Sequence, residues 1–264
     1  MLAREARLAG RQAYLSYKGL FLWLNWPAYV SNVFLRPGLI VAMFALTGRF
    51  ARGEAAVEAY VIGLTAYAVP SIVMGGLLQS FYYERSFGTL SFFFASRGSR
   101  AVSLLTRGVP HLPNAALVVV AGLLFSGAFL HTRFEGANWG AVTACYVVMA
   151  LASMACALCW ANLCIVLRDW LVVYSLMLTV FLVFTGVAIP RDELPLGLGA
   201  VGAALPVTHG LAGLRAAFEG AGVSSVAAHL AREALVGVAY AIAGYALLRA
   251  IEAQARRSGA YAAV

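Results

Sequence analysis

Six long stretches of apolar residues constrain this sequence more than any other feature. A bilayer core about 30 Å thick is crossed by roughly 20 helical residues. The stretches cover residues 27–48, 59–81, 109–130, 139–167, 170–189 and 234–248. The first is expected to kink at Arg36-Pro37, and the last, short by itself, is expected to begin near Ser225. The sequence therefore predicts an all-α integral membrane protein with six transmembrane helices.

The composition excludes the main soluble classes of protein. Hydrophobic residues make up 62% of the chain and charged residues 11%, whereas soluble domains carry about a quarter charged residues. Such a chain cannot cover a water-facing surface, which excludes a compact soluble enzyme and a disordered protein. The net charge of +8 would favour nucleic acid as the partner of a soluble protein. In a membrane protein it indicates basic cytoplasmic loops, so no nucleic acid is expected.

Basic residues are distributed unevenly between the two sides of the six stretches. With the N-terminus inside, twelve of the nineteen Lys and Arg residues lie in cytoplasmic segments and six lie outside, with Arg36 within the first stretch. Short loops that are rich in Lys and Arg stay on the cytoplasmic side. We therefore expect both termini to be cytoplasmic.

Residues 1–22 carry a segregated set of basic side chains. On a helical wheel, Arg4, Arg7, Arg11 and Lys18 fall within about 60° of one another, opposite an apolar face. This pattern predicts an amphipathic helix in the cytoplasmic interface, with its basic face toward anionic lipid head groups. The alternative is a solvated basic tail.

Residues 82–100, between the second and third stretches, form an aromatic cytoplasmic segment. Glu84 and Arg85 lie near its start, Gly88 follows, and a run of bulky apolar residues precedes Arg97. Exposed aromatic clusters mark a lipid boundary or a protein partner. The segment is therefore a candidate docking element, and the alternative is an anchor in the membrane interface.

Residues 190–228 are too long and too apolar for an ordinary outer loop. Residues 194–205, bounded by Pro195 and Pro206, supply only about twelve apolar residues, which cannot cross a bilayer. A second short helix that carries Arg215 is expected to follow. This pattern predicts an outer re-entrant helical hairpin before the last span.

Residues that perform catalysis or bind nucleotide are not grouped in this sequence. The single lysine, Lys18, is not part of a G-x-x-x-x-G-K-[ST] P-loop, so the chain is not expected to bind ATP through one. The eleven carboxylates are expected in loops, at span ends or in the N-terminal helix, which argues against a proton- or sodium-coupled carrier. Cys156 and Cys159, spaced as C-x-x-C, are expected to pack rather than to bind zinc, and no metal site is expected.

Taken together, the features resemble the permease subunits of ABC-2-type exporters. That family has a cytoplasmic coupling helix between spans two and three, with a pattern that resembles E-R-x-x-G-T-L. The matching residues are Glu84, Arg85, Gly88, Thr89 and Leu90. After span five the family has a Gly-x-x-x-Pro, a Leu-Pro and a Leu-Pro-x-Thr-(x)n-Leu-Arg run in an outer hairpin. The residues in these patterns are Gly186, Pro190, Pro195, Pro206 and Arg215.

The resemblance implies one ABC-2-type transmembrane domain over residues 1–264, acting as a transport subunit and not as an enzyme. Two permeases, identical or closely paralogous, would associate with two copies of a separate ATPase subunit, which would bind ATP and Mg²⁺. No cofactor is expected on this chain. Residues 82–100 would couple to the ATPase, and the outer hairpin would gate the path. The implied location is a bacterial inner membrane, and the tail resembles the drug-resistance branch.

The resemblance also implies a translocation path between the two permeases, lined by spans one, two and five. Tyr174, Phe181 and Phe184 are span-five aromatics that we expect near this path, with packing or lipid contact as the alternative. Arg36 is expected to line the path or a dimer interface, because a lone arginine in a span is unfavourable unless it reaches water or a partner. The alternative is a shallow first span that begins after Pro37.

The expected function is ATP-driven export of an amphipathic drug, lipid or glycan. Two rival functions are an integral membrane lipid-modifying enzyme and a non-transporting assembly factor. Such an enzyme would group charged or His residues tightly at the membrane boundary, and the sequence shows no such group. Co-purification of an ATPase would separate an exporter from an assembly factor.

Overall fold

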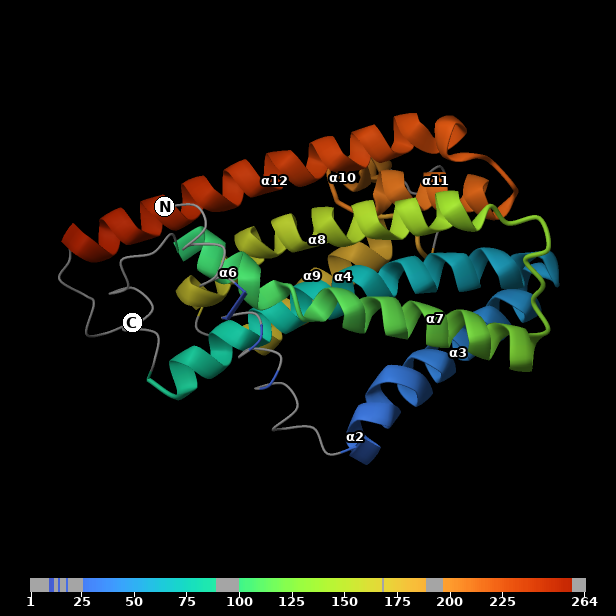
Figure 1. The fold of residues 1–264 in the computed structure, drawn as a ribbon, viewed down its shortest axis with the longest axis horizontal. Coiled ribbons are helices and arrows are strands. Elements are labelled where there is room, and N and C mark those ends of the chain that lie inside the picture. The colour runs from blue at the N-terminus through green and yellow to red at the C-terminus, as the bar shows by residue number, and fades with distance from the viewer. Residues whose placement is uncertain are drawn as a thin grey trace.

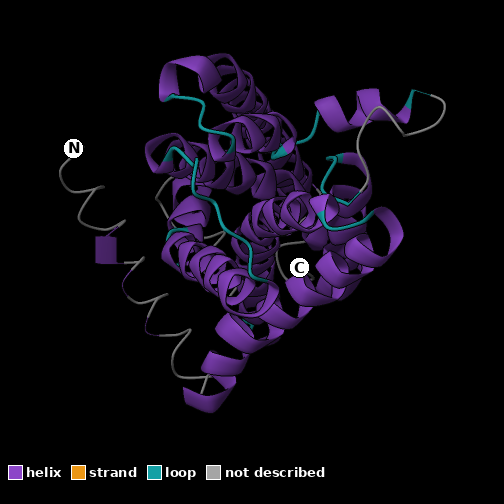
Figure 2. Cartoon of the chain, turned by 90° about the vertical axis from the view of Figure 1, so that its right-hand side faces the viewer, coloured by secondary structure: helices purple, strands orange, loops and turns teal. Residues whose placement is uncertain are grey.

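The computed structural model describes residues 10, 11, 14, 18, 26–88, 100–167, 169–188 and 197–257. Within these ranges the chain forms helices joined by loops, without strands (Figure 2). Five helices are long and apolar enough to cross a membrane, and a shorter apolar helix covers Trp170–Phe184. The chain is therefore an all-α, multi-pass membrane protein, as the sequence predicted. Most of the expected N-terminal helix lies outside the described residues.

The long helices form an elongated bundle (Figure 1). In chain order the elements are α2 (Trp26–Val30), the π-helical turn η1 (Ser31–Leu35), α3 (Arg36–Arg52), α4 (Ala55–Ser86), α6 (Arg100–Gly108), α7 (His111–Leu130), α8 (Trp139–Leu167), α9 (Trp170–Phe184), α10 (Leu198–Ala203), α11 (Thr208–Phe218) and α12 (Val223–Arg257). Here "outer end" denotes the end with the loops 131–138 and 219–222, and "inner end" the end at which α4 and α8 finish. Both names follow the predicted orientation.

The first span is one helix with a π-helical turn in its inner half. Pro37 has no backbone N–H, so the usual bond from this position to the carbonyl of Val33 cannot form. The backbone widens, and the N–H of Arg36 donates to the carbonyl of Ser31, five residues earlier. The kink predicted at Arg36-Pro37 thus takes the form of this turn, and the apolar helix runs unbroken over Trp26–Arg52.

Helix α4 is the centre of the bundle. Most of its apolar length is buried, including the fully buried side chains of Val61, Met74 and Leu77. It packs against α3, α7, α8 and α9. At 1.5 Å per residue its 32 residues extend about 48 Å, well beyond a hydrocarbon core of about 30 Å. Its last turns therefore carry the start of the 82–100 segment away from the membrane core.

The cysteines of α8 are free and pack inside the bundle, as expected. Cys156 is fully buried, and the sulfur of Cys159 lies 3.6 Å from the carbonyl oxygen of Tyr240. One turn further along, the side-chain amide of Asn162 donates to the carbonyl of Gly244 at 3.0 Å. Interhelical hydrogen bonds of this kind hold helices together inside a membrane, where lipid is as apolar as the helix faces.

Two predicted span boundaries are wrong. The fifth span was expected over 170–189, but α9 ends at Phe184 because Gly186 adopts φ 84° and the helix cannot continue through it. The sixth was expected to begin near Ser225 and to end at Leu248; α12 begins at Val223, close to the expected start, but extends to Arg257. Glu233 interrupts the apolar run in the sequence without interrupting the helix, because its carboxylate finds hydrogen-bond partners inside the protein.

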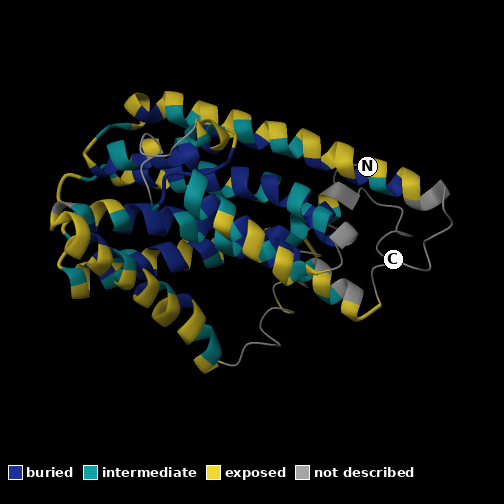
Figure 3. Cartoon of the chain, turned by 180° about the vertical axis from the view of Figure 1, so that it is seen from behind, coloured by how far each residue is buried: buried dark blue, intermediate teal, exposed yellow. Residues whose placement is uncertain are grey.

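The first span and α12 carry many exposed positions (Figure 3), and a series of these on each helix is occupied by large apolar residues. They repeat every three or four residues, the spacing of one helical face. On the first span they are Leu35, Leu39, Met43, Leu46 and Phe50, and on α12 they are Leu235, Val238, Ile242 and Tyr245. Such faces suit contact with lipid or with a second membrane chain.

Candidate functional site

A cavity of about 390 Å³ opens in the inner half of the bundle. We call it the Arg36 cavity. The first span, α4, α7 and α9 form its walls, and polar and apolar side chains alternate over them. The polar residues are Tyr29, Asn32, Arg36, Ser71, Gln79, His111, Asn114 and Tyr174, and the others are Val33, Ile72, Gly75, Gly76, Pro110, Pro113, Leu117, Val118 and Trp170.

Two adjacent glycines of α4 make room for two of the rings in the cavity wall. A Cβ atom on Gly75 would lie 2.6 Å from Cε2 of Tyr174, and one on Gly76 would lie 2.2 Å from the ring of His111. Both distances are shorter than any tolerable contact, so the rings occupy this place only because residues 75 and 76 have no side chain. The pair lies on α4, the most buried of the five long apolar helices.

Hydrogen bonds tie the walls of the cavity to one another. The Tyr29 hydroxyl of the first span donates to Oδ1 of Asn114 on α7 at 3.3 Å. The Tyr174 hydroxyl of α9 donates to the carbonyl oxygen of Ser71 on α4 at 3.5 Å, a long contact. The first bond joins the first span to α7, and the second joins α9 to α4.

Arg36 brings a positive charge to this cavity without an acidic partner among the described residues. The ion pairs among the described residues lie outside the cavity and join Arg49 to Glu54, Arg133 to Glu135 and Arg249 to Glu252. Arg36 is exposed and acts electrostatically on the Tyr174 phenol. The structure therefore places together Arg36 and Tyr174, two of the four predicted path residues.

The other two predicted path residues lie elsewhere on α9. Phe181 is fully buried and packs in the hydrophobic core, and Phe184 is half-buried at the end of the helix. Neither lines the Arg36 cavity. A hydrophobic residue on an apolar helix gives no sequence signal for which face it occupies, and helix packing decides that here.

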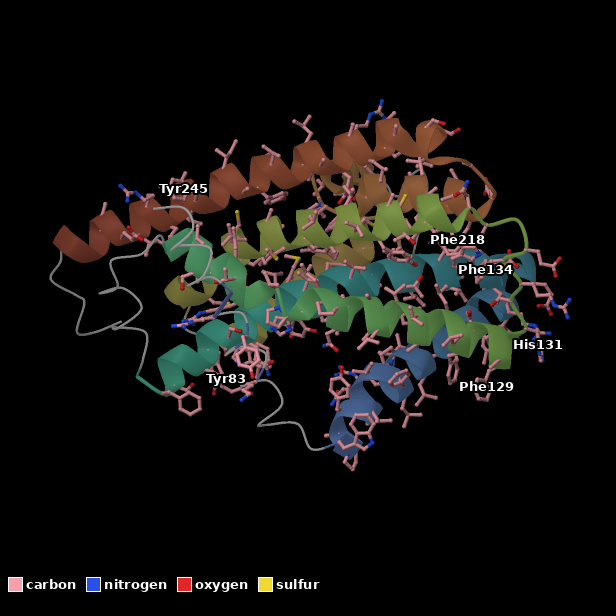
Figure 4. All side chains as sticks on the ribbon, viewed as in Figure 1. Tyr83, Phe129, His131, Phe134, Phe218 and Tyr245 are labelled. Atoms are coloured by element: carbon pink, nitrogen blue, oxygen red, sulfur yellow. The ribbon has the colours of Figure 1, made fainter. Side chains whose placement is uncertain are left out.

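A row of aromatic rings leads from the 82–100 segment to the Arg36 cavity. Ring centroids lie 6.1 Å apart for Phe87 and Tyr83, 5.8 Å for Tyr83 and Tyr82, 5.7 Å for Tyr82 and Trp170, and 5.8 Å for Trp170 and Tyr174. These separations are typical of interacting aromatic pairs. Figure 4 shows Tyr83 near the inner end of α4. The Tyr83 hydroxyl also accepts a hydrogen bond from Gln79 of the cavity wall, at 3.3 Å.

The predicted coupling residues lie at and just beyond the end of α4. The backbone of Glu84 and Arg85 belongs to its last turn, so the segment begins as an extension of the second span. Gly88 follows in a turn with φ 68°, a conformation that favours glycine. Thr89 and Leu90 lie outside the described residues.

At the outer end, α10 and α11 form a short hairpin against the bundle. The Arg215 guanidinium on α11 donates to the carbonyl oxygen of Gly186, just after α9, at 2.8 Å. Two of the predicted gate residues are therefore in direct contact. Pro206 lies in the turn between α10 and α11, and Pro190 and Pro195 lie outside the described residues.

Glu233 is a functional candidate that sequence reasoning missed. It was expected at the end of a span, but it lies within α12 and is fully buried. Its two carboxylate oxygens accept hydrogen bonds from the backbone N–H groups of Val207 and Gly210, at the start of α11. A carboxylate at a helix N-terminus satisfies amides that lack helical partners. An acid that continues the helical pattern between Ser225 and the apolar run 234–248 was the signal that could have indicated it.

Val207 shows what the Glu233 carboxylate holds in place. Its φ is 79°, a backbone conformation that is strained for a β-branched residue by about 1–3 kcal/mol. Its N–H donates to Glu233, so the strained turn that starts α11 is anchored to α12. Together, Glu233 and Arg215 fasten α11 to α12 and to the segment that follows α9.

Comparison with known protein families gives a match over most of the chain. The family model described as ABC-2 type transporter matches residues 1–218, which include the described walls of the Arg36 cavity and all of α11. No curated protein sequence matches the chain.

Proposed function

Because the chain belongs to the ABC-2 type transporter family, we propose that it is the membrane-spanning permease subunit of an ATP-driven exporter. Family membership implies an ATPase partner in general. Our proposal adds that two copies of a separate ATPase bind ATP and Mg²⁺ and that a second permease completes the path. It also places the complex in a bacterial inner membrane, with both termini cytoplasmic, exporting an amphipathic drug, lipid or glycan.

The observation that carries the proposal is the connection between the Arg36 cavity and the 82–100 segment. One uninterrupted helix, α4, contributes Ser71, Gly76 and Gln79 to the cavity and ends beside that segment. The ring contacts from Phe87 to Tyr174 provide a second connection over the same distance. A displacement of the segment by an ATPase would therefore be transmitted to the cavity through packed groups rather than through a loose loop.

This arrangement supports a mechanism of alternating access. Closure of the ATPase dimer on ATP would move residues 82–88, and α4 would carry the movement to the wall of the Arg36 cavity. The cavity lies in the inner half, where cargo would enter, and α11 of the hairpin packs against α8 and α12 in the outer half. In this mechanism the contact of Arg215 with Gly186 is part of the outer closure.

Purification of the complex tests the proposal directly. Solubilised from its native membrane under mild conditions, the permease should bring with it an ATPase of soluble composition. Vesicles that contain both chains should export a labelled amphiphile only when ATP is supplied. Recovery of the permease with lipid alone, or as an oligomer of this chain without an ATPase, would contradict the proposal.

A further inference from the structure

The charges around the Arg36 cavity distinguish between classes of cargo. Arg36 is the one Lys, Arg, Asp or Glu among the described residues that line it. One acid, Asp169, directly precedes a lining residue, Trp170, in the sequence. Its carboxylate already accepts hydrogen bonds from the backbone N–H groups of Leu171 and Val172. Among the described residues, the lining of the cavity itself therefore carries one formal charge, the positive charge of Arg36.

Two neutral groups of the wall, the Asn114 side-chain amide and the Trp170 indole, can donate hydrogen bonds to a ligand. Oδ1 of Asn114 is occupied by the Tyr29 hydroxyl, which leaves the Asn114 amide N–H groups as its remaining polar function. The indole N–H of Trp170 is a donor and cannot accept. A ligand group that accepts hydrogen bonds and carries negative charge satisfies both features, since ionised phosphate and carboxylate oxygens are acceptors.

The remaining wall is apolar and limits the size of the ligand. Val33, Ile72, Leu117 and Val118 present hydrocarbon surface beside the polar groups. A volume of about 390 Å³ lies at the lower end of the range of roughly 300–1,000 Å³ typical of small-molecule sites. The cavity therefore accommodates a head group with part of an attached chain, and not a folded polypeptide.

We propose that the Arg36 cavity binds the anionic head group of an amphiphile, with Arg36 as its charge partner. The inference rests on the proposed function and narrows the cargo to amphipathic anions. The phosphate or carboxylate would pair with Arg36 and accept hydrogen bonds from Asn114, and the alkyl portion would lie against the apolar wall. A membrane phospholipid and a free amphipathic anion present the same chemistry to this site.

Binding to the isolated permease tests the assignment without the ATPase. The full-length chain is placed in nanodiscs of phosphatidylcholine and titrated calorimetrically with dodecyl phosphate, dodecyltrimethylammonium or dodecanol, each corrected for partition into empty nanodiscs. Saturable binding is expected for dodecyl phosphate alone. Nanodiscs that contain phosphatidylglycerol separate the two sources of ligand: competition identifies a lipid head group, and unchanged binding identifies a free amphiphile.

Three variants connect that binding to Arg36. Arg36→Gln should weaken dodecyl phosphate binding about tenfold to hundredfold, the range expected when a charged hydrogen-bond partner is lost. Arg36→Lys retains the charge and should restore most of the affinity. Arg52→Gln removes an arginine from the outer end of the same helix and should bind as the unmodified chain does. If Arg36→Gln fails to fold, the test rests on Arg36→Lys, which preserves the charge, and on the comparison of the three probes with the unmodified chain.

Two results would overturn the inference. One is equal binding of the cationic and anionic probes, and the other is unchanged affinity for dodecyl phosphate in Arg36→Gln. Either result would leave ATPase association and ATP-driven export unaffected, so the proposed function would stand. Conversely, a permease that binds the anion but recruits no ATPase would contradict the proposed function and still support the anion site.

Discussion

The Arg36 cavity and the outer hairpin place charged side chains in opposite circumstances. At the hairpin, Glu233 is fully buried and bonded to the start of α11, and Arg215 bonds to Gly186. In the cavity, Arg36 is exposed and has no acidic partner among the described residues. A buried charge is tolerated when the protein itself satisfies it, and a charge that faces open space is available to a ligand. The charged groups at the outer end therefore stabilise the fold, whereas Arg36 in the inner half is available to bind a ligand.

The largest expected effect is an all-or-none difference in access between the two ends. In a variant without native cysteines, Gly222→Cys should react with a membrane-impermeant maleimide added to intact cells, because the loop 219–222 lies at the outer end. Ser86→Cys, at the inner end of α4, should react only after the membrane is opened. Labelling of Ser86→Cys in intact cells would invert the orientation and, with it, the two roles compared here.

Removal of the Glu233 carboxylate should have the largest effect on stability. Glu233→Ala leaves two backbone amides of α11 without their charged acceptor, and each such bond contributes about 1.5–3 kcal/mol. We expect a loss of about 3–5 kcal/mol in the free energy of unfolding, measured by denaturant titration in detergent. Glu135→Ala, in the exposed outer loop, is the control and should change little. Unfolding of Glu233→Ala at the unmodified midpoint would show that the hairpin does not depend on this contact.

Changes at the end of α4 should affect partner binding and leave folding intact. In Gly88→Val a β-branched residue replaces a glycine with φ 68°, and Glu84→Lys reverses the charge in the segment that resembles a coupling helix. Each should weaken ATPase association by about 2–5 kcal/mol if a contact charge or close fit is lost, measured by pull-down at graded ATPase concentrations. Gly136→Val introduces the same side chain into open space in the outer loop. Normal ATPase recovery with both inner variants would reduce the segment to a membrane anchor.

Filling the space between α4 and α7 should deform the cavity at moderate cost. In Gly76→Ala the new methyl group would meet the His111 ring at 2.2 Å, and overpacking of this kind destabilises by about 1–3 kcal/mol. The effect is measurable as a lower unfolding midpoint. Replacing the ring as well, in Gly76→Ala with His111→Ala, should recover part of the loss. An unaltered midpoint in the single variant would indicate that the ring moves aside freely.

The smallest expected effect is that of Arg36→Gln on stability. Since no described acid pairs with Arg36, its removal should change the free energy of unfolding by only about 0.5 kcal/mol, as for other exposed positions. The measurement is the same denaturant titration used for Glu233→Ala, so the two charges are compared on one scale. A loss as large as that of Glu233→Ala would mean that Arg36 supports the fold, and the contrast between the two regions would disappear.

Hydropathy and local backbone chemistry determined much of this protein before its tertiary structure was known. The apolar stretches predicted the helices because crossing a bilayer depends on length and composition within one segment. Pro37 predicted an irregularity in the first span because a missing N–H is a local fact. The short apolar run between Pro195 and Pro206 predicted a hairpin because about twelve residues cannot cross a bilayer.

Tertiary packing decided which residues meet in the two regions. Gly76 and His111, Tyr82 and Trp170, and Glu233 and Val207 are each separated by more than twenty residues in the chain, so no local pattern relates them. Phe181 and Tyr174 have similar apolar surroundings in the sequence, yet one packs in the core and the other lines the cavity. The two residues lie seven positions apart on the same face of α9, so their positions along the helix distinguish them: Tyr174 reaches the gap at Gly75 of α4, and Phe181 packs further along in the close-packed core.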